Sequence, residues 1–317
     1  MVIRFLEAPA QKIRNGNVVT SERWHSILEV LGHRVISSQG CDGGVCDVLI
    51  AFNAYKNRQA ILTARLTGSA AHIVVCLTGT DLYQDLKNDP AAEDVLYLAD
   101  QLVVLQPMAL LELPPALRDK AMVILQSAVP PALCPVREAE SFDVCVIAHL
   151  REIKDPLRTA QAARLLPPES RIRVFQVGKA LSDEMARSAA LETDENPRFH
   201  WLGEQSGERT TQILAKSRLL VLSSFFEGGA NVVSEAVVCG VPVIGSDIPC
   251  MRGLLGADYP GLFPVGDTRR LAELLLRAES DGAFYNELAE RCRRESYKFH
   301  PTRERESMVK LLDRVFM

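Results

Sequence analysis

Short apolar runs alternate with segments of helical periodicity along the first part of the chain. The runs are rich in β-branched residues and occupy residues 2–8, 33–37, 46–52, 72–79, 99–106 and 121–127. Between the first two, residues 18–32 place apolar side chains such as Trp24 and Leu28 at helical spacing, and Gly32 supplies a stop. Strands that are apolar throughout are buried on both faces. The pattern therefore predicts a parallel sheet that helices cover on both sides.

A proline-rich segment, residues 128–142, separates this series from a second one. The second alternating series starts at residue 142, and residues 301–317 form one more amphipathic helix. We therefore expect two doubly wound α/β domains, residues 1–130 and 141–300, with the last helix packing back on the first domain. Open α/β sheets bind ligands outside the carboxyl ends of their strands, so we expect the functional site in a cleft between the domains.

Composition and charge exclude several classes of protein. The net charge of −4 and the pI of about 5.9 give no basic footprint for nucleic acid. No apolar segment reaches the roughly 18 residues of a membrane span. The N-terminus, with Arg4 and Glu7 in or beside its apolar part, fits a first strand better than a secretory signal. The eight cysteines form no CxxC pair, which favours reduced thiols in a cytoplasmic protein without a metal cluster.

The segment SSFFEGGANVVSEAVVCGVPVIGS, residues 223–246, carries the strongest functional signal. Gly228 and Gly229 allow positive φ and close backbone approach, and a helix follows, with Glu235 about two turns into it. Amides at such a turn, together with the positive end of the helix dipole, form a cradle for phosphate. The cradle needs neither Glu227 nor Glu235, so we expect each to face a neutral, hydroxyl-rich group such as a sugar or a ribose. On spacing alone, an ordinary strand–turn–helix connection with a solvated Glu235 explains the pattern equally well.

Residues 143–280 resemble the donor-binding half of group-4 retaining glycosyltransferases. The segment EGGANVVSE matches the E-x7-E element of that family, and AVVCGVPVIGSDIP and GLFPVGDTRRLAELL resemble its continuation. The resemblance implies a GT-B fold, with two Rossmann-like domains that face one another across a cleft. It also implies that Glu227 lies beside the donor sugar and that Glu235 binds the ribose hydroxyls. The residues whose amides would meet the diphosphate and the sugar are Gly228, Gly229, Ala230 and Asn231.

The chain departs from the family pattern after the first strand of the second domain. There the family places an Arg and, five residues on, a Lys, and both steady the diphosphate. The Arg position is His149 here, the Lys position is Lys154, and Arg151 lies between them. By the resemblance, Lys154 neutralises the leaving group, with Arg151 or His149 in support. A solvated loop cation explains Arg151 equally well, and a satisfied histidine at a strand end explains His149 better than a catalytic one.

A basic glycine loop near the N-terminus is the counterpart cradle in the first domain. Gly16 and Asn17 precede a helix, and Lys12 and Arg14 add positive charge. The resemblance implies that this loop contacts the acceptor phosphate or the donor diphosphate. A basic loop beside a first strand is also common in proteins that bind neither.

A wider set of motifs resembles the selenosugar synthases, a branch of the same family. The motifs are GNVVTSERW, LTGTDLY, VLQP, HLREIKDPLRTAQAARLLP, EGGANVVSEA and LGADYPGLFPVGDT, and they span nearly the whole chain. The resemblance implies transfer of the sugar of a UDP-sugar, such as UDP-N-acetylglucosamine, to selenophosphate in selenoneine biosynthesis. It implies no cofactor and no metal, because such folds neutralise the diphosphate with basic side chains and amides.

The segment LTGTDLY, residues 77–83, is a second departure from the group-4 pattern. Many members carry a histidine there, close to the sugar, whereas this chain has Thr80 and Asp81. An alcohol acceptor needs a base, but selenophosphate arrives as an anion, so the loss of a base fits that acceptor. Thr80 and Asp81 are equally well explained as the cap of a helix that begins at Leu82. The alternative functions are an ordinary group-4 glycosyltransferase with an alcohol acceptor, a UDP-sugar epimerase, and a noncatalytic nucleotide-sugar sensor.

Overall fold

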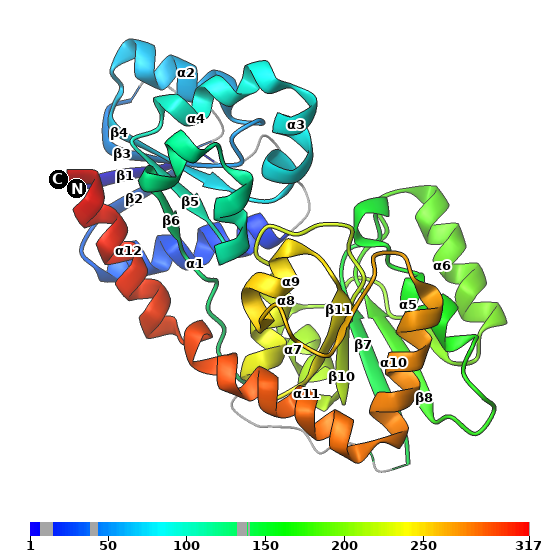
Figure 1. The fold of residues 1–317 in the computed structure, drawn as a ribbon. Coiled ribbons are helices and arrows are strands. Elements are labelled where there is room, and N and C mark those ends of the chain that lie inside the picture. The colour runs from blue at the N-terminus through cyan, green and yellow to red at the C-terminus, as the bar shows by residue number, and fades with distance from the viewer. Residues whose placement is uncertain (7–14, 39–43, 132–137, 139, 317) are drawn as a thin grey trace. The chain divides into compact units, whose positions relative to one another are not determined.

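The computed structural model describes residues 1–317 except residues 7–14, 39–43, 132–137, 139 and 317, and Figure 1 shows its fold. It divides into two compact units, which are described one at a time. Unit 1 comprises Met1–Gln126, Glu227–Ala230 and Pro301–Met317. Unit 2 comprises Ser127–Phe226 and Asn231–His300.

Unit 1 is built on a parallel sheet. Its described strands are ordered β2 (Arg34–Ser38), β1 (Val2–Leu6), β3 (Cys46–Phe52), β4 (Ala70–Leu77), β5 (Gln101–Val104) and β6 (Ala121–Val123). All neighbouring pairs are parallel, and Ile3 of β1 lies opposite Val48 of β3. Each of these strands overlaps an apolar run that the sequence pattern predicts as a strand, although β4 begins two residues before its run and β2 ends one residue after its run.

Helices cover both faces of this sheet, as Figure 1 shows. Because side chains alternate along a strand, Val48 and Ile50 of β3 pack on the face that α1 (Gly16–Val30) and α12 (Pro301–Phe316) cover. Leu49 packs on the opposite face. The elements on that face are α2 (Arg58–Thr67), α4 (Asp94–Leu98), the π-helical turn η1 (Asp81–Asp85) with α3 (Leu86–Asn88), and the 3₁₀ segments η2 (Pro90–Glu93), η3 (Pro107–Glu112) and η4 (Pro115–Lys120).

A buried carboxylate fastens α12 to α1. Glu304 is only 2% exposed, although it lies on an otherwise amphipathic helix. Its Oε1 accepts a hydrogen bond from Trp24 Nε1 at 2.8 Å, and its Oε2 accepts one from Arg23 Nε at 2.7 Å. Trp24 is itself fully buried against the sheet. The helix of residues 301–316 therefore belongs to the core of unit 1, although it lies some 280 residues away in the sequence.

Unit 2 repeats the architecture with another parallel sheet. Its described strands are ordered β12 (Leu262–Phe263), β11 (Val243–Ser246), β10 (Leu219–Leu222), β7 (Phe142–Ile147), β8 (Ile172–Val177) and β9 (Phe199–Trp201). All neighbouring pairs are again parallel. With β7 and β10 side by side in the middle, the carboxyl ends of two strands that are distant in sequence lie next to one another. The predicted class, two parallel-sheet Rossmann-like units, is confirmed.

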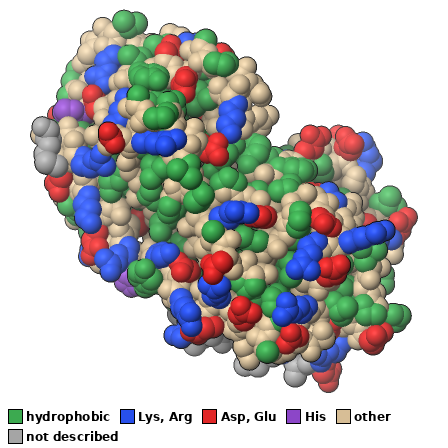
Figure 2. Space-filling model, viewed as in Figure 1, with side chains coloured by type: hydrophobic (Ala, Val, Ile, Leu, Met, Phe, Trp, Pro, Cys, Tyr) green, Lys and Arg blue, Asp and Glu red, His purple; other side chains and the backbone are tan. Residues whose placement is uncertain are grey.

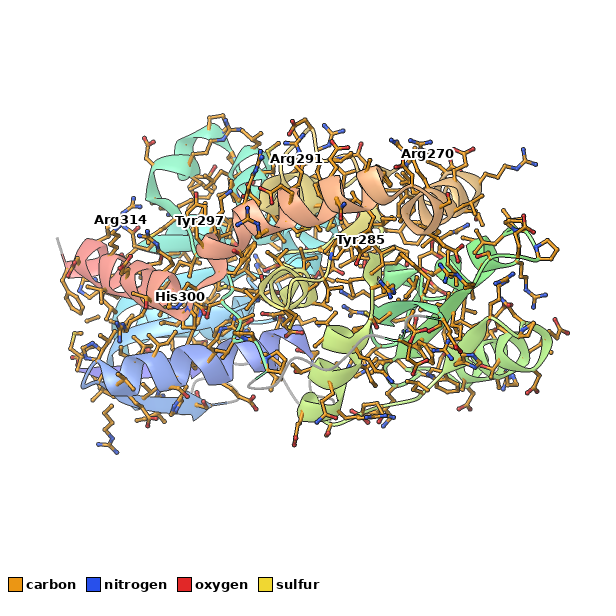
Figure 3. All side chains as sticks on the ribbon, turned by 90° about the horizontal axis from the view of Figure 1, so that it is seen from below. Arg270, Tyr285, Arg291, Tyr297, His300 and Arg314 are labelled. Atoms are coloured by element: carbon orange, nitrogen blue, oxygen red, sulfur yellow. The ribbon has the colours of Figure 1, made fainter. Side chains whose placement is uncertain are left out.

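Helices and short helical turns connect the strands of unit 2. They are η5 (Glu152–Lys154), α5 (Arg158–Ala163), α6 (Asp183–Glu195), α7 (Gly207–Lys216), α8 (Asn231–Val238), α9 (Pro249–Leu255), α10 (Thr268–Ser280), α11 (Gly282–Glu295) and η6 (Ser296–Phe299). The Asp267 side chain caps α10 by accepting a hydrogen bond from the Arg270 amide at 2.9 Å. Tyr285 of α11 (Figure 3) donates its hydroxyl to the Arg218 carbonyl at 2.9 Å and so ties that helix to the sheet.

The distribution of charge and the apolar character of the helices bear on nucleic-acid binding and on membrane insertion. On the face that Figure 2 shows, basic and acidic side chains of the described residues are interspersed rather than gathered by sign. Within the described part of the chain, no helix combines the length and the apolar character that a bilayer crossing requires.

Candidate functional site

The predicted donor motif starts where β10 ends, and the boundary between the units falls inside it. Glu227–Ala230 belongs to unit 1, whereas Asn231 and Glu235 belong to unit 2. The left-handed backbone of the turn lies at Ala230, with φ of 46°, and not at either glycine as expected. The glycines serve close approach instead, because a Cβ on Gly228 would lie 2.3 Å from the Thr78 carbonyl oxygen, which also belongs to unit 1.

Helix α8 brings Asn231 and Glu235 onto one face. The helix begins at Asn231, so Glu235 lies about one turn into it, not about two. Residues four apart are neighbours on a helix surface, which places these two side chains together. Glu235 is half-buried, which does not fit a fully solvated helix residue. The positive end of the helix dipole at the start of α8 favours an anion there, and the Glu235 carboxylate lies about one turn away.

Lys154 lies in a tight turn, residues 151–155, that is called here the Lys154 turn. Its backbone is fastened to the end of β10, because the Phe225 amide donates to the Ile153 carbonyl at 2.9 Å. The structure thus brings Lys154 next to the segment that leads into the donor motif, although the two are about 70 residues apart. Lys154 is half-buried and Arg151 is exposed, so Lys154 is the better placed of the two to act at low dielectric.

His149 lies at the carboxyl end of β7 and is engaged by the neighbouring strand. Its Nδ1 accepts a hydrogen bond from the Lys179 amide at 3.1 Å. The backbone segments that follow β7 and β8 approach closely here, since a Cβ on Gly178, at φ of 147°, would lie 2.0 Å from the Ala148 carbonyl oxygen. The geometry therefore agrees with a histidine satisfied at a strand end.

The loop that contains Thr80 and Asp81 is organised around a buried carboxylate. Asp81 is fully buried, and its oxygens accept the amides of Thr78, Gly79 and Ala54, each at 2.9 Å. Burial raises the pKa of Asp81, while these backbone N–H groups oppose the rise. Asp81 therefore joins the loops after β3 and β4. It begins a π-helical turn one residue before the expected helix start.

Asn53 is a member of this loop cluster that the sequence pattern did not single out. It adopts a left-handed backbone with φ of 72°, and its Nδ2 donates to the hydroxyl oxygens of Thr78 and Thr80 at 3.3 and 3.1 Å. Asparagine after a strand is a signal for such a conformation, because its short polar side chain tolerates it. The loop therefore displays two oriented hydroxyls in place of a titrating side chain.

The first glycine loop is only partly described. Lys12 and Arg14 lie outside the described residues. Helix α1 begins at Gly16, earlier than expected, because the Asn15 side chain caps it. The side-chain oxygen Oδ1 of Asn15 accepts a hydrogen bond from the Asn17 amide at 2.9 Å. The cap therefore already engages this amide, which the resemblance assigned to a phosphate. Gly16 itself is exposed at the first turn.

The titratable side chains do not suggest a metal centre. Among the residues that the structure describes, no group of three or more His, Cys, Asp or Glu side chains is arranged to hold a metal ion. Of the described cysteines, Cys76, Cys145, Cys250 and Cys292 are buried in the packed interior.

Known structures and a family model identify the class of protein to which this fold belongs. Two solved structures match over 99% of both chains: HepE from Anabaena in complex with UDP and glucose, with a TM-score of 0.78 at 17% identity, and sucrose-phosphate synthase from Thermosynechococcus elongatus, with 0.81 at 16%. Their likeness identifies the fold as that of GT-B glycosyltransferases. The family model for group 1 glycosyl transferases matches residues 136–299, just over half of the chain. The chain belongs to the group 1 glycosyltransferase family.

A curated relative matches part of the chain. It is N-acetyl-alpha-D-glucosaminyl L-malate synthase from Bacillus anthracis, which is 26% identical over 153 residues. The match covers 48% of this chain and 40% of that relative, so the chain spans less than half the length of the curated relative.

Proposed function

We propose that this protein transfers the sugar of a UDP-sugar, most simply UDP-N-acetylglucosamine, to selenophosphate. Support for the donor comes from unit 2, where the Lys154 turn is hydrogen-bonded to the segment that follows β10, and α8 begins further along the same connection. Two related proteins point to the same donor class. HepE was solved with UDP and glucose, and the curated relative is named for an N-acetylglucosaminyl group.

The choice of acceptor depends on Asp81. A carboxylate that is fully buried and holds three backbone amides cannot take a proton from an incoming alcohol. Selenophosphate needs no such base, because it arrives as an anion with a soft selenium nucleophile. The two hydroxyls that Asn53 orients, on Thr78 and Thr80, suit the phosphate oxygens of that acceptor.

The reaction balances without a cofactor. The selenium anion attacks the anomeric carbon, the carbon–selenium bond forms, and the carbon–oxygen bond to the β-phosphate of UDP breaks. UDP leaves with the electron pair and carries the developing negative charge. In this mechanism Lys154 and the amides at the start of α8 stabilise that charge, while the selenium atom is held close to the anomeric carbon.

Mass spectrometry of a reaction mixture tests the acceptor directly. Purified protein, UDP-N-acetylglucosamine and selenophosphate should give a sugar product with the selenium isotope pattern and one UDP per product. Parallel reactions replace selenophosphate with phosphate, thiophosphate, malate or glycerol. If UDP were released with an alcohol and not with selenophosphate, the chain would be an ordinary glycosyltransferase. A UDP-sugar that is altered without release of UDP would indicate an epimerase.

Replacing Glu235 tests the donor site. Charge-assisted hydrogen bonds contribute about 1.5–3 kcal/mol, so Glu235→Ala should weaken UDP binding roughly 10- to 100-fold. Titration calorimetry with UDP measures the change, and circular dichroism checks the fold. Glu184→Ala is the matched control, because Glu184 is an exposed glutamate on α6 of the same unit. An unchanged affinity for UDP in the Glu235 variant would remove that residue from the site.

A further inference from the structure

The Lys154 turn holds a backbone conformation that its sequence disfavours. Asp155 lies at φ of 44° and ψ of 52°, in the left-handed region, where a Cβ crowds the following carbonyl. Pro156 comes directly after it, and proline further restricts the residue that precedes it. Such a conformation persists only where the surrounding structure holds it in place.

The first anchor of the turn is the Asp155 carboxylate. Its Oδ2 accepts a hydrogen bond from Arg158 Nε at 2.6 Å, in an ion pair whose side chains are 21% and 15% exposed. The Arg158 Nη1 atom then donates to Thr268 Oγ1 at 2.7 Å, at the first residue of α10. One guanidinium thus ties the turn to a helix more than 100 residues away.

The second anchor is the Ser223 hydroxyl at the end of β10. Ser223 is only 2% exposed, and its Oγ lies 2.8 Å from the Asp155 carbonyl oxygen and 3.2 Å from that of Lys154. The same segment continues through Phe225, whose amide bonds the Ile153 carbonyl. The strand end therefore orients consecutive carbonyls of the turn and, with them, the direction in which the Lys154 side chain leaves the backbone.

We propose that Asp155 and Ser223 are positioning residues that fix Lys154 at the departing diphosphate. The inference rests on the proposed function, in which Lys154 neutralises the leaving group. The side chains of Asp155 and Ser223 are engaged with Arg158 and with carbonyls of the turn, so both act through Lys154. The four-carbon side chain of a lysine is flexible, so the position of its ammonium group depends on how firmly the backbone at Lys154 is held. A displacement of about 1 Å at a reacting group costs on the order of 100-fold in rate.

Asp155→Gly separates positioning from stability. Glycine adopts the left-handed region without strain, so the turn keeps its backbone preference while it loses the link to Arg158. We expect kcat for UDP release to fall about 10- to 100-fold, with KM and the melting temperature changed far less. Asp155→Asn keeps both the tolerance for this backbone and an oxygen for Arg158, so it should restore most of kcat. Asp258→Gly is the control, because it removes an exposed ion pair with Arg291 in the same unit.

The decisive measurement repeats the substitutions in the absence of the lysine. If the anchors act through Lys154, Asp155→Gly and Ser223→Ala each lower kcat in the native protein and add nothing to Lys154→Ala. Equal losses in both backgrounds would overturn the inference, and so would a wild-type kcat in Asp155→Gly. A wild-type protein that neither binds UDP nor releases it from a UDP-sugar would overturn the proposed function and, with it, this role.

Discussion

Lys154→Ala is expected to lower turnover of the UDP-sugar by about 10²–10³-fold, equivalent to roughly 2.7–4 kcal/mol of lost transition-state stabilisation. Negative charge grows on the departing diphosphate as the bond to the sugar breaks. A preorganised cation at that position stabilises the transition state more than the bound donor, so kcat should fall more than KM rises. The half-buried position of Lys154 strengthens the effect, because charges interact more strongly where water is partly excluded.

The rate of UDP release at saturating selenophosphate measures this prediction. Lys216→Ala is the matched control, since Lys216 is an exposed lysine of α7 that pairs with Glu138 in the same unit. Arg151→Ala should cost less than Lys154→Ala, because Arg151 is exposed and water screens its charge. Turnover within about threefold of wild type in the Lys154 variant, a change worth under 1 kcal/mol, would exclude it as the leaving-group cation.

Glu304→Ala is expected to lower the free energy of unfolding of unit 1 by about 3–5 kcal/mol, the usual cost of removing one partner from a buried ion pair. The substitution removes the acceptor of the indole N–H of the fully buried Trp24 and the carboxylate that accepts from Arg23 Nε. It also opens a gap between α12 and α1. Glu304→Gln keeps the shape and one oxygen acceptor, so its loss should be smaller.

Urea unfolding followed by fluorescence measures the loss in the unit concerned. The chain has two tryptophans, Trp24 in unit 1 and Trp201 in unit 2, so a Trp201→Phe background leaves a reporter for unit 1 alone. Glu306→Ala is the control, because Glu306 lies on the same helix and pairs with Arg303 at the surface. If the two glutamate variants had the same unfolding midpoint, the buried pair would not stabilise unit 1.

Most of the fold could be predicted from local pattern. Strands such as β3 and β4 are apolar on both faces, so their type follows from composition alone. The exact ends of helices and turns are harder to predict from the sequence, because they depend on single side chains. Asn15 caps α1 and moves its start to Gly16, and Ala230 takes the left-handed backbone that the neighbouring glycines suggested.

The candidate site divides in the same way. Lys154, Glu227 and Glu235 are visible because a short motif carries each of them. Asn53 and Ser223 are not, since their importance comes from hydrogen bonds to residues 25–69 positions away. The sequence offered Thr80 and Asp81 as a helix cap, but the turn that begins at Asp81 has no side-chain cap hydrogen bond. The Asp81 carboxylate instead holds the loops after β3 and β4, which only the fold reveals.

The return of α12 to unit 1 has a consequence for how the chain acquires its structure during synthesis. Met308 and Leu311 complete the apolar layer over β3 and β1, yet the ribosome makes them after all of unit 2. Until then the nascent unit 1 lacks the part of this apolar layer that α12 contributes, and exposed apolar surface favours aggregation. Unit 1 is therefore completed last, although most of its residues are synthesised first. Truncation before Pro301 would remove α12 and, with it, the apolar side chains that this helix packs on the sheet of unit 1.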